Sequence, residues 1–129
     1  SLTGTLPPEL SLMKGLQGLI LNNNSFTGTL PTELGRLTAL LLASLADNGF
    51  TGTVPLELVN LKELIGLDVS VNGLTGAMPA ELSQLSKLTF FFFHQNNFTG
   101  SVNDIFCSDT NRTWVILEGD CLDDGSGQV

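Results

Sequence analysis

A repeat of 24 residues is the feature of this sequence that most constrains its fold. Pro7, Pro31, Pro55 and Pro79 follow one another at intervals of 24 residues, and each ends a phrase of the form (Leu/Phe)-Thr-Gly-x-apolar-Pro. A fifth phrase, at 98–103, ends in asparagine instead of proline. A fixed period of this length is typical of solenoids, in which each coil buries its apolar side chains against the neighbouring coils.

Each repeat predicts a helical segment followed by a strand. After the proline comes a Glu-Leu pair with apolar residues three and six positions later, as in Leu34, Leu37 and Leu40, which is helical spacing. A short alternating run then predicts a strand with one inward face, at 19–21, 43–45, 67–69 and 91–93. The recurring glutamates suit the start of a helical turn, where negative charge is favourable, and an acidic binding ladder is the alternative. They are Glu9, Glu33, Glu57 and Glu81.

One asparagine follows each predicted strand at a constant position. These residues are Asn24, Asn48, Asn72 and Asn96. A side-chain amide both donates and accepts hydrogen bonds, so stacked copies can satisfy the peptide groups of neighbouring loops. We therefore expect a structural asparagine ladder rather than a catalytic row.

The combined pattern over residues 1 to about 103 resembles the plant-type leucine-rich repeat. The resemblance implies an α/β solenoid, a right-handed coil with a short parallel sheet on its concave side. It also implies helical or 3₁₀ segments on the convex side and a second small strand near the Thr-Gly phrase. Similar arrays serve as receptor ectodomains and as secreted inhibitors, so the resemblance implies recognition of a protein or peptide through the concave face, in a receptor-like or secreted protein.

The sequence divides into an array, a cap and a tail. The leucine-rich repeat array occupies 1–103 and starts within a repeat, so we expect it to be a piece of a longer array. The period fails in 104–122, which predicts a C-terminal cap, and 123–129 is an acidic, glycine-containing tail. A calcium loop in this tail is the weaker interpretation, because the alternating ligands and closing glutamate are missing.

The cap contains the two cysteines of the chain, Cys107 and Cys121, and their single possible pairing predicts a disulfide. Two free thiols are the alternative. The ending around these cysteines also resembles caps of secreted algal leucine-rich repeat proteins. Glycosylation sequons at Asn23, Asn97 and Asn111 are consistent with an extracellular location, although the first two lie within the Asn-rich repeat itself.

Charge and composition exclude several function classes. Five Lys and Arg against 13 Asp and Glu give a formal net charge of −8, which disfavours nucleic acid and anionic lipid as partners. No apolar run approaches the ~18 residues that a membrane-spanning helix needs. A single histidine, His94, and the absence of hydrolase or phosphate-binding motifs predict no enzyme activity, no cofactor and no metal site.

The outward positions of the predicted strands are the candidate ligand-binding residues. Several are apolar, which is unexpected on a solvated face and is typical of a recognition surface. The candidates are Ile20, Asn22, Leu42, Ser44, Asp68, Ser70, Phe90, Phe92 and His94. The alternative is that the cap, further coils or a second copy of the chain covers Phe90 and Phe92.

A row of threonines forms a second candidate surface. Each Thr-Gly phrase places hydroxyl and methyl groups at solenoid spacing, which resembles an ice-binding face. The row comprises Thr3, Thr5, Thr27, Thr29, Thr51, Thr53, Thr75, Ala77, Thr99 and Ser101. Ice binding, or a purely structural solenoid, is therefore the alternative function, and the repeat's own preference for Thr-Gly is the simpler explanation.

Overall fold

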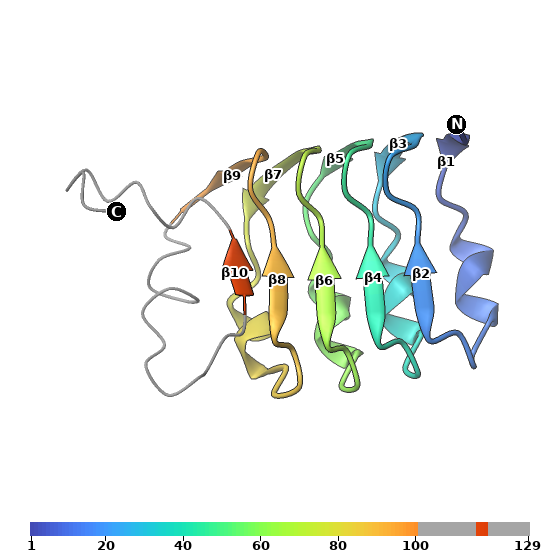
Figure 1. The fold of residues 1–129 in the computed structure, drawn as a ribbon, viewed down its shortest axis with the longest axis vertical. Coiled ribbons are helices and arrows are strands. Elements are labelled where there is room, and N and C mark those ends of the chain that lie inside the picture. The colour runs from blue at the N-terminus through green and yellow to red at the C-terminus, as the bar shows by residue number, and fades with distance from the viewer. Residues whose placement is uncertain (101–115, 119–129) are drawn as a thin grey trace.

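The protein is an open solenoid of repeated coils (Figure 1). The structure, a computed structural model, describes residues 1–100 and 116–118. One parallel sheet, which we call the concave sheet, has the order β10-β8-β6-β4-β2. Its strands are β2 (Gly18–Ile20), β4 (Leu42–Ser44), β6 (Gly66–Asp68), β8 (Phe90–Phe92) and β10 (Ile116–Glu118).

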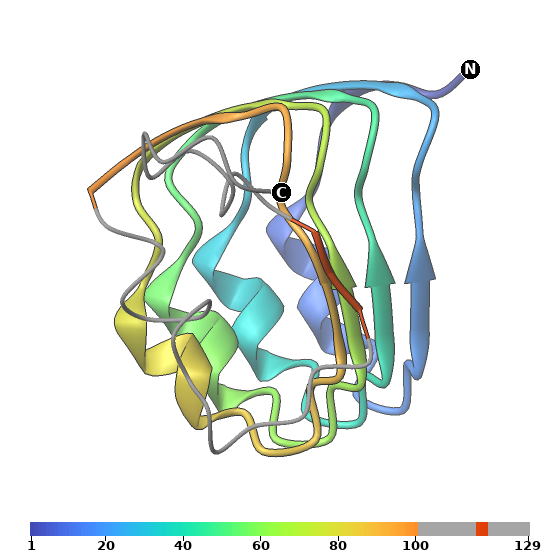
Figure 2. The ribbon, with the colours of Figure 1, turned by 60° about the vertical axis from the view of Figure 1, so that its left-hand side comes forward.

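A second parallel sheet is formed around the Thr-Gly phrases. Its strands are β1 (Thr3–Thr5), β3 (Ser25–Thr29), β5 (Gly49–Gly52), β7 (Gly73–Ala77) and β9 (Asn97–Thr99). Within the described residues, four 3₁₀ segments lie on the side opposite the concave sheet (Figure 2). They are η1 (Pro8–Leu12), η2 (Thr32–Arg36), η3 (Leu56–Asn60) and η4 (Ala80–Gln84). The predicted leucine-rich repeat fold is confirmed, with 3₁₀ rather than α-helical segments.

The leucine spacing explains why these segments are 3₁₀ helices. In the second coil, Leu34 N donates to Pro31 O at 3.1 Å, Leu37 N to Leu34 O at 3.1 Å, and Leu40 N to Leu37 O at 2.9 Å. These bonds link residues three apart, as in a 3₁₀ helix; the first two belong to η2 and its C-terminal end, and the third closes the turn that follows. All three leucines are buried, so a repeat of three directs one side chain per turn into the core.

The four predicted strands of the concave sheet, β2, β4, β6 and β8, begin and end one residue earlier than the sequence predicts. The ladder nevertheless continues past each strand, because Leu21 N donates to Ser44 O and Leu45 N to Asp68 O, both at 2.8 Å. Leu19 and Leu67 point into the core from the middle of their strands. The inward and outward faces therefore follow the predicted alternation.

The asparagine side chains join each coil to the one before it. Asn48 Nδ2 donates within its own coil to Leu45 O and Ala46 O, both at 3.2 Å, and across to Leu21 O at 2.9 Å. Its Oδ1 accepts from Phe26 N at 3.0 Å. The same arrangement recurs at Asn72 and Asn96.

A close contact between threonine and glycine also connects successive coils. Gly52 has a φ of +77°, and a Cβ at this position would lie 2.9 Å from Thr29 Cγ2. Gly28 and Gly76 make the same approach to the threonine of the preceding coil. Glycine is required here both by the backbone conformation and by the space that the threonine methyl group occupies.

Most of the predicted cap and tail lies outside the described residues, including Cys107, Cys121 and Asn111, and so does Ser101 of the threonine row. Of this region the structure describes the backbone of β10, which pairs in parallel with β8 through Ile116 and Phe90, Leu117 and Phe91, and Glu118 and Phe92. β10 therefore adds a strand beside β8 in the plane of the concave sheet.

Candidate functional site

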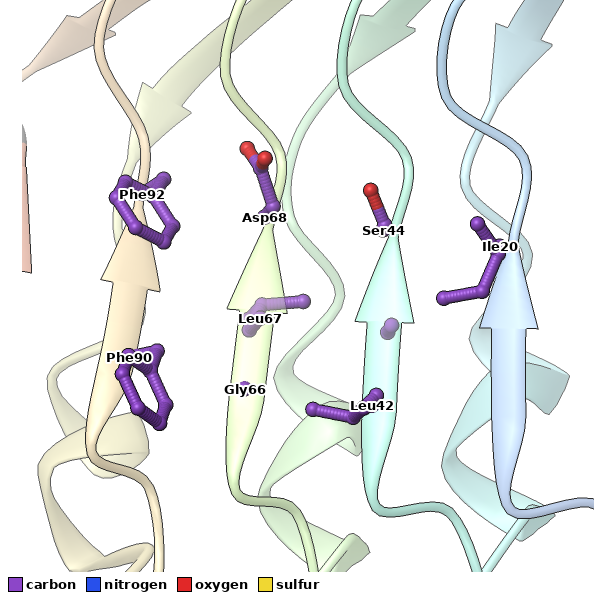
Figure 3. Close-up of a pocket in the computed structure, with 9 residues that line it drawn as sticks. Ile20, Leu42, Ser44, Gly66, Leu67, Asp68, Phe90 and Phe92 are labelled. Atoms are coloured by element: carbon purple, nitrogen blue, oxygen red, sulfur yellow. The ribbon is translucent and has the colours of Figure 1, made fainter.

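An apolar groove lies on the outer face of the concave sheet (Figure 3). It has a volume of about 240 Å³. Its lining residues are Ile20, Leu42, Ala43, Ser44, Gly66, Leu67, Asp68, Phe90 and Phe92. Ile20 is 61% exposed and Leu42 is 48% exposed, whereas Phe90 and Phe92 are half-buried. The apolar candidates from the sequence are thus gathered around one hollow.

β6 forms the floor of this groove. Phe90 and Phe92 stand on β8 on one side of it, and Leu42 reaches toward it from β4 on the other (Figure 3). A Cβ on Gly66 would lie 2.9 Å from Leu42 Cδ2 and 3.8 Å from Phe90 Cβ. Leu42 therefore leans over Gly66, which is itself buried, and any larger side chain at this position would have to displace Leu42.

Asp68 is the charged group of the groove. Ser70 holds it from within the same coil, because Ser70 N donates to Asp68 Oδ1 at 3.0 Å and Ser70 Oγ donates to the same oxygen at 2.6 Å. Asp68 is half-buried and stands next to Ser44 and Phe92 in the register of the sheet. The two bonds from Ser70 fix the orientation of the carboxylate at one end of the groove.

Three of the nine candidates from the sequence do not line the groove. Ser70 is only 4% exposed, so it supports Asp68 instead of facing a ligand. Asn22 and His94 are half-buried and follow their strands, and their backbone oxygens accept from Asn24 Nδ2 at 3.2 Å and Val71 N at 3.0 Å. Alternation holds along each strand but ends at the corner that follows it, which explains why these positions differ from the prediction.

Gly66, Ala43 and Leu67 line the groove but were not selected as candidates from the sequence. Ala43 and Leu67 are buried inward positions that border its base. Gly66 occupies the same outward column as Leu42 and Phe90, and a glycine between two large side chains was the available signal for a hollow.

The corner after each strand has a left-handed backbone conformation. The residues concerned are Asn23, Asp47, Val71 and Gln95, with φ values of +58°, +54°, +53° and +55°. A β-branched residue is strongly disfavoured in this region, so Val71 is strained. Asn23, a predicted glycosylation residue, is exposed at this corner, and Asn97 is exposed in β9.

The threonine row lies on the second sheet and faces solvent. Its described members from Thr3 to Thr99 are all exposed. Thr51 Oγ1 donates to Gly28 O at 3.5 Å, and Thr75 Oγ1 donates to Gly52 O at 3.4 Å. The row therefore combines exposed methyl and hydroxyl groups with contacts that hold neighbouring coils together.

Residues 1–100 and 116–118 contain no group of three or more His, Cys, Asp or Glu side chains placed to bind a metal ion. Within the same residues, no helix has the length and apolar character needed to cross a membrane.

These coils, ladders and paired sheets define a leucine-rich repeat solenoid of the plant type. The family model described as Leucine Rich Repeat matches residues 15–37. No curated protein sequence matches the chain.

Solved structures extend this assignment beyond the single matched repeat. The BIR2 ectodomain from Arabidopsis thaliana is 32% identical, with a TM-score of 0.78 over 82% of this chain and 56% of that one. The plant peptide hormone receptor RGFR1 in complex with RGF2 is 33% identical, with a TM-score of 0.70 over 74% of this chain and 15% of that one. A plant ice-binding protein is 34% identical, with a TM-score of 0.78 over 82% of this chain and 34% of that one.

This chain therefore spans about half the length of the BIR2 ectodomain and a smaller share of the other two.

Proposed function

We propose that this protein is a non-enzymatic recognition module that binds a peptide or an extended protein segment in the groove of its concave sheet. The observation that carries the proposal is the convergence of Ile20, Leu42, Phe90 and Phe92 on a single hollow. Exposed apolar clusters of this kind mark interaction sites. The similarity to a receptor in complex with a peptide hormone supports the same function.

The dimensions of the groove favour a segment of a larger ligand over an enclosed small molecule. Small-molecule pockets usually measure about 300 to 1,000 Å³ and bury most of their ligand. This groove measures about 240 Å³ and lies on the open face of a sheet (Figure 3). It is suited to one or two side chains of an extended segment lying along β6.

An extracellular location, in a receptor-like or secreted protein, is part of the proposal. The similarity to the BIR2 ectodomain supports it, as do the exposed side chains of Asn23 and Asn97. A disulfide between Cys107 and Cys121 and a glycan on Asn111 are further expectations from the sequence.

Selection from a random peptide library displayed on phage tests the proposal directly. We expect enriched peptides to bind the wild-type protein and to lose binding to an Ile20→Ser/Leu42→Ser variant, whose substituted side chains are exposed and do not support the core. Leu56→Ser, which alters an equally exposed leucine on η3, is the matched control. Peptides that bind both variants equally, or no enrichment at all, would contradict recognition through the groove.

Ice binding through the threonine row is the second candidate function. It is favoured by the solvent exposure of the row and by the similarity to a plant ice-binding protein. If it is correct, the wild-type protein shapes ice crystals and inhibits their recrystallisation, and Thr27→Lys/Thr51→Lys abolishes both effects. Round crystals without thermal hysteresis in the wild-type protein would exclude it.

A further inference from the structure

Asp68 has one carboxylate oxygen left for a ligand. Both hydrogen bonds from Ser70 go to Oδ1. In the part of the chain that the structure describes, Oδ2 has no hydrogen bond, and the ion pair found there joins Lys87 to Glu63 instead. Solvent screens a charge pair less at a half-buried carboxylate than at a fully exposed one. A cationic group from a ligand could therefore form an effective ion pair with Asp68.

The hollow above Gly66 lies beside this carboxylate. Gly66 and Asp68 are two residues apart on β6, so their outward faces are separated by about 6.7 Å along the strand. Leu42 and Phe90 border the hollow, and Phe92 borders Asp68 (Figure 3). An apolar site and an acidic site therefore follow one another along the floor of the groove.

The spacing of these two sites matches an extended chain. Residues i and i+2 of an extended segment project to the same side and are also separated by about 6.7 Å. A segment lying along β6 would direct residue i into the hollow and residue i+2 toward Asp68. The intervening residue would face away from the sheet.

We infer that the groove recognises an extended peptide segment with an apolar residue and a lysine or arginine two positions apart. The apolar side chain enters the hollow between Leu42 and Phe90, and the cation pairs with Asp68 Oδ2. The net charge of −8 attracts such a ligand at long range. Pairing with Asp68 then aligns the peptide so that its apolar residue lies at the hollow. This inference rests on the proposed recognition function and specifies its ligand.

Four capped synthetic peptides test the inference. They are Gly-Leu-Ser-Lys-Gly, its reversed core Gly-Lys-Ser-Leu-Gly, a norleucine-for-lysine version of the first, and Gly-Leu-Lys-Ser-Gly, in which the cation is moved by one position. Binding is followed by NMR through the amide signals of residues 18–20, 42–44, 66–68 and 90–92. We expect one of the two peptides with i, i+2 spacing to bind about fivefold more tightly than the norleucine and shifted peptides, as a partly buried ion pair allows.

Two matched substitutions separate a local ion pair from the net charge. Asp68→Asn keeps an acceptor for Ser70 but removes the charge, and we expect it to abolish the preference for lysine. Asp47→Asn removes an exposed charge at the corner after β4, outside the groove, and we expect it to preserve the preference.

Gly66→Val tests the apolar half of the site. We expect this variant to weaken every peptide, because the new side chain collides with Leu42 and pushes it into the hollow. A circular dichroism melt that matches the wild type checks that Gly66→Val is folded. A folded Gly66→Val protein that binds as the wild type does would overturn the assignment of the hollow.

Three further outcomes would overturn the inference: equal affinity of the lysine and norleucine peptides, an equal effect of Asp47→Asn and Asp68→Asn, or no shift of the groove amides with any peptide. The library selection still decides the proposed function in each case. Library peptides that need Ile20 and Leu42 but contain no paired cation would support recognition through the groove while contradicting this ligand class.

Discussion

The concave sheet and the second sheet are built by the same repeat, yet they present very different surfaces. The second sheet repeats nearly the same threonines and glycines in every coil, and its glycines fit against threonines of the preceding coil. The concave sheet keeps its inward residues apolar but varies its outward ones, with Leu42, Gly66 and Phe90 in a single row. Uniform positions hold the solenoid together, and varied positions form the groove.

Removing the asparagine ladder should have the largest effect on stability. Asn48→Ala leaves three backbone oxygens and Phe26 N with fewer partners. Since each unsatisfied buried group costs about 1 to 3 kcal/mol, we expect the free energy of unfolding to fall by about 3 kcal/mol in a urea titration. Asn60→Ala, at an exposed position in η3, is the control and should change stability by less than about 0.5 kcal/mol.

The contact between Gly52 and Thr29 should contribute somewhat less. Gly52→Ala combines a positive φ with a clash against Thr29 Cγ2, so we expect a loss of about 2 kcal/mol in the free energy of unfolding. Adding Thr29→Ser removes the clashing methyl group and should restore part of the loss, because the backbone strain remains. No recovery in the double variant would show that the methyl contact is unimportant.

Relieving strain at Val71 should stabilise the protein. Val71→Asn places a residue that tolerates the left-handed region where a β-branched one now stands, and we expect a gain of about 1 kcal/mol by urea denaturation. Asp47→Asn at the equivalent corner is the matched control and should change stability little, since aspartate already tolerates this conformation. Equal effects at both corners would argue against strain at Val71.

Changing the exposed wall of the groove should have the smallest effect on folding. Ile20→Ser alters a side chain that is 61% exposed, so we expect the free energy of unfolding to change by less than about 0.5 kcal/mol. Affinity for a peptide selected from the library should nevertheless fall. A large loss of stability would show that Ile20 belongs with the uniform positions that hold the coils together.

The fold could be predicted from the sequence because its strongest constraints are local and repeated. The period of 24, the leucines at intervals of three and the recurring asparagine each have one simple structural explanation, and the structure agrees with the predicted solenoid. The same regularity indicated which strand residues face outward, including Ile20, Leu42, Phe90 and Phe92.

The finer details of the site depend on interactions between coils and on the corners of each coil. Ser70 was predicted to face a ligand, but it follows the end of β6 and its buried side chain bonds Asp68 instead. The hollow above Gly66 depends on how Leu42 leans across from the neighbouring strand. A repeat pattern gives the column in which each residue lies, whereas side-chain direction between columns requires the packed structure.

The asparagine ladder has a consequence for how such a surface can change over evolutionary time. Each asparagine bonds its own coil and the one before it. Exchanging a whole unit of 24 residues therefore preserves the asparagine hydrogen bonds at both junctions with the neighbouring coils. Replacing residues 49–72 would exchange the floor of the groove, including Gly66 and Asp68, while the walls on β4 and β8 stay in place. Specificity in this scaffold can therefore be recombined in modules without redesigning the framework.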